Sequence, residues 1–144
     1  LMDFGATLDG YHSDMTRTVG VGQVSGEQRD VYQLVLKAQL ETLQAIKAGK
    51  TGTQCDAVAR DIIESAGYKG CFDHGTGHGV GLEIHEEPRL SPGAGQELLP
   101  GMIVTVEPGI YLAGKFGVRI EDMVVVTGEG CKNLTNSPKE LIEL

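Results

Sequence analysis

The pattern of apolar and polar positions divides the chain into a β-rich beginning, a helical middle and a β-rich second half. Short runs of mixed polarity bounded by turn residues predict strands, and apolar residues recurring every three or four positions predict helices. In chain order, the predicted elements are a β-hairpin over residues 1–8 and 11–19, helices over 26–48 and 53–67, and strands over 102–112 and 117–127. No repeat or linker interrupts this order, which predicts one compact α+β unit.

Capping signals place the ends of the two helices. Ser25 and Gln28 have the spacing of a capping box, so the first helix is expected to begin directly after Ser25. Thr53 and Asp56 are expected to begin the second helix, and Gly67 is expected to end it.

The first hairpin is expected to bring two aspartates together. With a two-residue turn at Asp9-Gly10, Asp3 lies opposite Thr16, and Asp14 is the diagonal neighbour of Asp3. With a four-residue turn over 7–10, Asp3 and Asp14 face each other directly. Because strand side chains alternate between faces, both registers place the two carboxylates on one face.

The second strand pair repeats this arrangement with two glutamates. A three-residue loop over 113–115 places Glu107 directly opposite Glu121. Two carboxylates about 5 Å apart repel by about 3 kcal/mol at an effective dielectric constant near 20. These positions therefore either face solvent or hold a cation between them. Arg119 is a candidate counter-ion for one carboxylate, but it cannot neutralise four.

The segment HGTGHGVGLEIH, residues 74–85, holds three of the four histidines. Its alternating glycines disfavour a helix, because each costs about 1 kcal/mol relative to alanine. In an extended chain His74 and His78 point the same way, and glycine lets another backbone or a ligand come close. One imidazole with four carboxylates suits divalent Mn, Co or Fe, and two such cations form a hydrolytic clamp. Taken singly, each motif is also compatible with surface charge, a turn or a loop.

Composition narrows the function classes. Twelve Lys and Arg against twenty Asp and Glu give a net charge of −8 with no basic run, which disfavours nucleic acid and anionic membrane as partners. Three widely spaced cysteines without a CxxC motif predict free thiols and a cytoplasmic location. No apolar run reaches the roughly 18 residues of a membrane helix. The opening LMDFGA already has the pattern of a strand, so we expect the chain to be a piece of a longer polypeptide.

Four motifs in order carry a family resemblance: DFGATLDGYHSDMTRT, HGTGHGVGLEIHEEP, VEPGIY and GVRIEDMV. Together they closely resemble the pita-bread metallopeptidases of family M24, in the Xaa-Pro peptidase branch of prolidase and aminopeptidase P. The resemblance implies an α+β pita-bread fold, here a curved antiparallel sheet with covering helices. It also implies that residues 1–144 are the C-terminal part of one catalytic domain, without the upstream half or any N-terminal domain.

The resemblance also implies two divalent metal ions, with Mn(II) preferred and Co(II), Fe(II) or Zn(II) as alternatives. Asp3 would bind one metal, Asp14 and Glu121 would bridge both, and His78 and Glu107 would hold the other. A hydroxide bridging the metals would attack the peptide carbonyl, and Glu107 would handle its proton. The remaining implied roles are substrate binding by His85, a pocket wall at His74, and support of the bridging glutamate by Arg119.

The implied activity is hydrolysis of the bond between an N-terminal residue and proline, in short peptides with proline second. The full-length protein would be a homodimer, and the chain alone would be weakly active or inactive without its missing half. The alternatives are another pita-bread peptidase such as a methionine aminopeptidase, a non-catalytic binding module on the same fold, and an acidic domain that stores metal.

Overall fold

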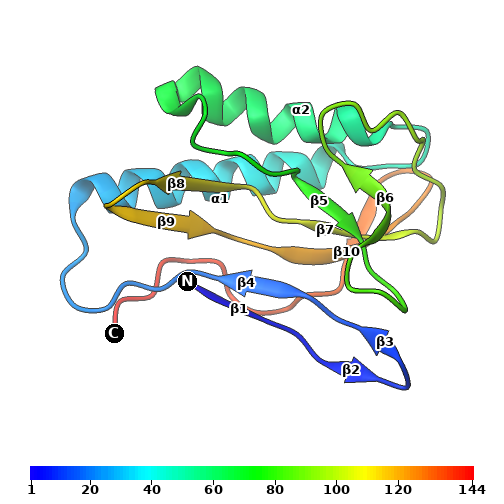
Figure 1. Cartoon of the computed structure of the whole chain (residues 1–144), viewed down its shortest axis with the longest axis horizontal. Coiled ribbons are helices and arrows are strands. Elements are labelled where there is room, and N and C mark those ends of the chain that lie inside the picture. Colours follow the sequence, from blue (N-terminus) through cyan, green and yellow to red (C-terminus); the bar gives the residue numbers. More distant parts are fainter.

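The computed structural model describes all residues, 1–144, as a curved β-structure with two helices on one face (Figure 1). The helices are α1 (Gly26–Ala45) and α2 (Gly52–Ile63), and α2 continues into one turn of π-helix, η1 (Glu64–Tyr68). The strands are β1 (Met2–Phe4), β2 (Thr7–Leu8), β3 (Tyr11–His12), β4 (Met15–Arg17), β5 (Gly77–Gly79), β6 (Glu86–Leu90), β7 (Ile103–Val106), β8 (Gly109–Leu112), β9 (Phe116–Arg119), β10 (Asp122–Val126) and β11 (Cys131–Asn133). The α+β class predicted from the sequence is confirmed.

The N-terminal hairpin has the register of the two-residue turn. Leu8 pairs with Tyr11, and Asp3 pairs with Thr16. Asp9 and Gly10 both have positive φ, 51° and 85°, which a tight two-residue hairpin turn requires. The four-residue alternative is therefore wrong, and Asp14 is a diagonal neighbour of Asp3.

The first helix begins as predicted, but the second does not. The Ser25 capping box is present, and α1 ends at Ala45, three residues earlier than expected. The second helix is capped by Thr51, whose capping box uses Gln54, so the predicted beginning at Thr53 is wrong. Gly67 has φ 94° and ends the helical run near the expected place.

The second strand pair is one long hairpin interrupted at its two glutamates. Leu112 pairs with Phe116 across a three-residue loop, and Val106 pairs with Asp122 in the same register, so Glu107 and Glu121 lie opposite each other. The predicted strands 102–112 and 117–127 are each broken in two at this point. The ladder breaks beside them because Pro108 has no backbone N–H to donate, which leaves only a 3.5 Å hydrogen bond from the N–H of Ile120 to the carbonyl oxygen of Pro108.

Glycines let three strands of the main sheet lie unusually close. The sheet has the order β11-β10-β7-β5-β6, so β5 lies between β6 and β7. A Cβ atom on Gly77 would be 2.0 Å from the carbonyl oxygen of Thr105 in β7, and one on Gly79 would be 2.4 Å from that of Glu87 in β6. The expectation that glycine admits another backbone is confirmed at these two positions.

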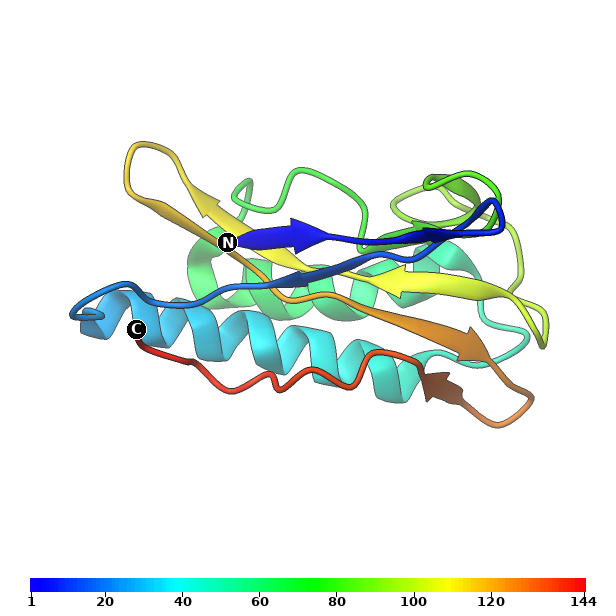
Figure 2. The same cartoon turned by 90° about the horizontal axis from the view of Figure 1, so that it is seen from below.

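Two apolar cores hold the helices against one face of the strands (Figure 2). One core joins α1 and α2 to β8 and β9, and the other joins Ile46 at the end of α1 and Cys55 of α2 to β7, β10 and Leu90. The last residues return beside the segment after β4, where Gly20 pairs with Glu143. All three cysteines are free, as expected, and neither helix has the length and apolar character that crossing a membrane requires.

Candidate metal centre

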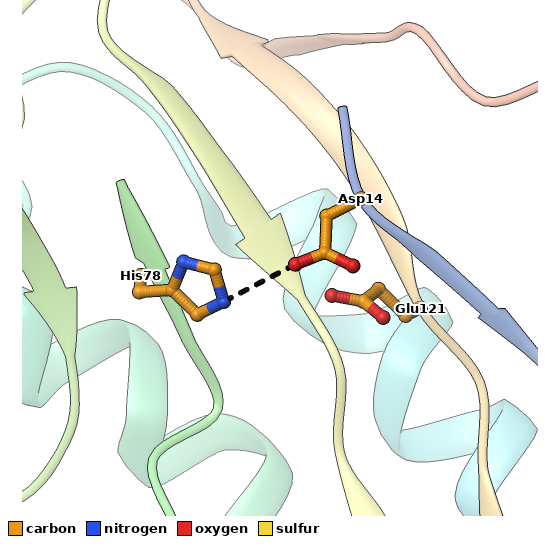
Figure 3. Close-up of side chains that lie close together, drawn as sticks. All are labelled: Asp14, His78 and Glu121. Carbon is orange, nitrogen blue, oxygen red and sulfur yellow. Dashed lines mark ion pairs between the residues drawn. The ribbon is translucent and has the colours of Figure 1, made fainter. Parts of the chain in front are cut away.

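Three predicted ligands from distant parts of the chain converge on the sheet face away from the helices. They are Asp14 just before β4, His78 in β5 and Glu121 just before β10 (Figure 3). One ligand atom from each lies within 4.8 Å of the other two. His78 Nε2 is 3.7 Å from Asp14 Oδ2. Such a set of carboxylate oxygens and an imidazole nitrogen can bind a divalent cation.

Backbone hydrogen bonds at the interrupted hairpin bring these segments together. The N–H of Glu121 donates to the carbonyl oxygen of Thr16 over 3.1 Å, and the N–H of Glu107 donates to that of Thr76 over 2.8 Å. Asp14 lies two residues before Thr16, and alternate strand residues share a face, so both face Glu121. His78 lies two residues after Thr76. The outward-pointing N–H groups of Glu107 and Glu121 therefore join this hairpin to the segments that carry His78 and Asp14.

Glu107 adjoins this cluster. Its Oε1 is 3.1 Å from His78 Nε2 and accepts a 3.0 Å hydrogen bond from the hydroxyl of Thr105. The same hydroxyl accepts the backbone N–H of His78 over 3.0 Å. Thr105 therefore fixes His78 and Glu107 relative to each other.

Asp3 faces the same pocket, but its carboxylate forms an ion pair with Arg119. Arg119 also donates to the hydroxyls of Thr16 and Tyr111, each over 3.0 Å, and its Nε is 4.0 Å from Glu107 Oε2. It is thus the counter-ion that the sequence suggested. Of the five predicted ligands, three cluster closely, Glu107 adjoins them, and Asp3 is held to one side by Arg119.

The shared burial of these carboxylates shifts their protonation. Burial first, and then the neighbouring Glu107 carboxylate, raise the pKa of Glu121 to about 8. Burial and the charge of Asp3 raise the pKa of Asp14. Burial alone would lower the pKa of His78, but its hydrogen bond to Glu107 and the nearby carboxylates outweigh burial and raise it. The protein alone therefore leaves the cluster short of positive charge.

A polar pocket of about 500 Å³ opens over the cluster. Its ten lining residues include no apolar side chain: Asp3, His74, Gly75, Gly77, His78, His85, Arg89, Ser91, Glu107 and Arg119. The rings of His85 and His78 are 4.3 Å apart. Both ring nitrogens of His74 are engaged, Nε2 with the hydroxyl of Tyr111 at 2.7 Å and Nδ1 with the carbonyl of Gly75 at 2.8 Å. His74 and His85 therefore both lie at the pocket, as predicted.

The sequence profile of metallopeptidase family M24 matches residues 1–128. The chain belongs to this family. It is 47% identical over 142 residues to an Xaa-Pro dipeptidase of Pyrococcus furiosus, covering 99% of this chain and 41% of that protein. It is 52% identical over 143 residues to the uncharacterized peptidase YqhT of Bacillus subtilis, covering 99% and 40%.

Solved structures agree with this family assignment. An Xaa-Pro dipeptidase from Bacillus anthracis superposes with a TM-score of 0.97 at 55% identity, covering 99% of this chain and 40% of that one. An X-Pro aminopeptidase from Thermotoga maritima gives a TM-score of 0.96 at 46% identity, covering 99% and 40%. The predicted pita-bread fold is confirmed, and the chain spans about 40% of the length of these relatives. Membership of an M24 metallopeptidase family implies divalent metal binding.

Sequence reasoning missed several residues that shape this M24 site. Thr16 and Thr105 bind the carboxylates of Glu121 and Glu107, and Arg89 and Ser91 line the pocket. A signal for the threonines was available, because each lies two residues from a predicted ligand and so on the same strand face. Arg89 and Ser91 had no such signal, since they reach the pocket through the pairing of β6 with β5.

Proposed function

We propose that the protein hydrolyses the peptide bond between an N-terminal residue and proline, using two divalent metal ions. The observation that carries this proposal is the cluster of Asp14, His78 and Glu121 under a pocket without apolar side chains. Relatives that match nearly the whole chain are named Xaa-Pro dipeptidase and X-Pro aminopeptidase, which supports the substrate class. We place residues 1–144 in the C-terminal part of a cytoplasmic, homodimeric enzyme's catalytic domain.

The donor atoms fit divalent cations. Asp14 and Glu121 are buried or half-buried carboxylates whose pKa values are raised first by burial and then by the charge of neighbouring carboxylates, and a cation would offset both costs. Oxygen donors with a single imidazole suit Mn(II) first, with Co(II), Fe(II) or Zn(II) as alternatives. We assign Asp3, Asp14, His78, Glu107 and Glu121 as the residues that would hold the ions, with Asp14 and Glu121 at the centre of the set.

The chain's own residues supply the remaining chemistry. Bound cations lower the pKa of water and so provide a nucleophile at neutral pH. Glu107 would accept the proton of the attacking water at Oε2, because Thr105 and His78 engage only its Oε1. His85, beside His78 in the pocket, donates to the carbonyl oxygen of the scissile bond. His74 has both nitrogens occupied and serves as pocket wall, while Arg119 orients Thr16 and Asp3.

Arg89 supports a preference for very short peptides. Its guanidinium lines the pocket and is half exposed, with its Nη2 3.4 Å from the carbonyl oxygen of His85. A dipeptide places its free carboxylate one residue beyond the scissile bond, and a guanidinium binds a carboxylate well. An Xaa-Pro dipeptide should therefore be cleaved more efficiently than the same dipeptide with an amidated C-terminus.

The test is a peptide panel assayed with the Mn(II)-loaded protein. Xaa-Pro dipeptides, longer Xaa-Pro peptides and Met-initiated peptides without proline separate the Xaa-Pro activity from that of a methionine aminopeptidase. Glu107→Gln controls for a contaminating peptidase and should lose nearly all activity, whereas Glu129→Gln, on an exposed loop, should lose none. Cleavage confined to Met-initiated peptides would move the assignment to the methionine branch. Metal binding without any cleavage would favour storage, and a folded protein that binds no Mn(II) would favour a non-catalytic module.

A further inference from the structure

Two residues of α2, Asp56 and Arg60, hold the backbone of the glycine-histidine segment from behind. The side chains form a two-point ion pair, with Arg60 Nε 2.7 Å from Asp56 Oδ2 and Nη2 2.9 Å from Oδ1. Arg60 also donates to the carbonyl oxygens of Phe72 and His74, over 2.9 and 2.8 Å. Asp56 accepts the backbone N–H and the hydroxyl of Thr76, over 3.0 and 2.9 Å. The pair therefore binds every second residue from 72 to 76.

This pair is saturated and buried. Asp56 is 2% exposed and accepts four hydrogen bonds, which uses the acceptor capacity of a carboxylate. The guanidinium carbon of Arg60 also stacks over the ring of Phe72 at 4.4 Å. Burying an ion pair gains little net stability over a well-packed apolar pair. Its value lies in fixing one geometry of the groups that it binds.

The segment that the pair holds has little conformational rigidity of its own. Gly75 and Gly77 alternate with His74, Thr76 and His78, and glycine loses more conformational freedom on folding than any other residue. Beyond the pair, the carbonyl of Thr76 accepts the N–H of Glu107, and His74 bonds Tyr111. A displacement at residues 72–76 would thus reach the catalytic face through Glu107 and through His74.

We propose that Asp56 and Arg60 are positioning residues, which set the histidines of the glycine-rich segment against the carboxylates of the metal centre. They touch neither substrate nor ligand side chains and act through the backbone of residues 72–76. The proposal rests on the proposed metal-dependent function, but its geometric part concerns the protein without metal.

Arg60→Lys tests the proposal most directly. Lysine keeps the charge beside Asp56 but cannot bind the carboxylate and two carbonyls together. We expect the Mn(II) dissociation constant, measured by calorimetry, to rise about 10- to 100-fold, with a similar fall in kcat/KM on an Xaa-Pro dipeptide. In the metal-free protein, the imidazole resonances of His74 and His78 should shift and the Thr76 amide should exchange faster with solvent. Thr76→Val, which removes only the hydroxyl bond to Asp56, should cause smaller changes of the same kind, and it serves if Arg60→Lys does not fold.

Ile63→Val is the matched control. Ile63 is fully buried on the same helix, so this change destabilises α2 without removing any hydrogen bond to residues 72–76. Although Ile63 shares an apolar core with Phe72, it makes no hydrogen bond to residues 72–76, so the change should lower the melting temperature and leave the dissociation constant and the His78 resonances unchanged. Unshifted resonances with wild-type Mn(II) affinity in the folded Arg60→Lys protein would overturn the proposal. If the wild-type protein bound no Mn(II), the proposed function would fall, and the metal-free resonances alone would still decide the geometric proposal.

Discussion

Glu121 and Asp122 are neighbours in the chain, and both are buried, but their surroundings are opposite. Asp122 points toward α1 and accepts hydrogen bonds from four side chains: Arg17, Gln39, Asn133 and Lys139. Glu121 points to the other face of the sheet and accepts one, from the hydroxyl of Thr16 over 2.6 Å. Its other neighbours, Asp14 and Glu107, are themselves acidic.

Their pKa values move in opposite directions for this reason. Burial would raise the pKa of Asp122, but bonds from Lys139 and Arg17 outweigh it and lower the value. Burial and like charge raise that of Glu121 to about 8. The sheet therefore carries one carboxylate whose charge the protein balances and, one residue earlier, one whose charge it leaves for a cation. That difference separates a structural acid from a proposed ligand more clearly than burial does.

Glu121→Gln should give the largest effect, and it falls on activity. The amide keeps the shape but loses the charge shared between two ions, so Mn(II) affinity and turnover should fall beyond the roughly 100-fold cost of losing an outer hydrogen-bond partner. The metal-free protein should melt at the same or a higher temperature, because glutamine removes the cost of protonating Glu121 on folding. Calorimetry measures the melting temperature and the Mn(II) affinity, and a peptidase assay measures turnover. Retained two-ion stoichiometry would contradict the role of Glu121.

Asp122→Asn should instead lower stability and leave Mn(II) affinity nearly unchanged. Arg17 and Lys139 would keep their buried charges without a balancing carboxylate, and breaking such a pair typically costs about 3–5 kcal/mol. Urea denaturation should show that loss, while the Mn(II) affinity of the folded fraction changes little. A variant as stable as the wild type would mean that Asp122 contributes no more than a surface carboxylate.

The pH dependence of stability should separate the two acids within one molecule. Between pH 4.5 and about 8 the metal-free folded state holds a proton on Glu121 that the unfolded state releases, so stability falls as pH rises. One such group contributes a slope of at most about 1.4 kcal/mol per pH unit. Asp122 has a lowered pKa, so its contribution is present above 3.8 and is lost as pH falls through its folded-state value.

Added Mn(II) should reduce the fall in stability between pH 4.5 and about 8, and it should leave the loss of stability at acid pH unchanged. Thermal melts from pH 3 to pH 9, with and without the ion, measure the stability in both pH ranges. The Glu121→Gln protein is the control, and even without metal its stability should fall less steeply toward alkaline pH, because only Asp14 and His78 of the cluster then contribute to that fall. A metal-free profile that rises through neutral pH would contradict the assigned environment of Glu121.

Much of the ligand geometry follows from the sequence because it depends on short loops. A two-residue turn fixes Asp3 opposite Thr16, and a three-residue loop fixes Glu107 opposite Glu121. Within a hairpin, loop length and the alternation of side chains decide which residues share a face. No such local rule relates the two hairpins to β5. Their convergence depends on the N–H groups of Glu107 and Glu121 leaving the hairpin to bond Thr76 and Thr16.

The wrongly predicted beginning of α2 also shows that local sequence rules do not determine contacts between distant segments. Thr51 with Gln54 and Thr53 with Asp56 are overlapping capping signals with the same spacing. The structure uses the first, which leaves the Asp56 carboxylate free to bond Arg60 one turn later and Thr76 across the interface instead of the N–H of Thr53. Two equivalent local signals were thus decided by a contact twenty residues away in the chain.

Thr16→Val should give the smallest effect and the sharpest comparison, because different atoms of Thr16 contact Glu121 and the partner of Asp122. Its hydroxyl donates to Glu121, whereas its carbonyl accepts from Arg17, the partner of Asp122. Valine removes only the hydroxyl, so the pKa of Glu121 should rise further while the Asp122 network stays intact. The expected loss of stability is about 1 kcal/mol larger at alkaline pH, where Glu121 is charged, than near pH 5, where the main cost is the lost hydrogen bond from Arg119 Nε. Thr42→Val, which removes a buried hydroxyl bond within α1, is the control and should cost a similar amount at both pH values. Equal losses at both pH values for Thr16→Val would show that its hydroxyl supports the fold and not the charge on Glu121.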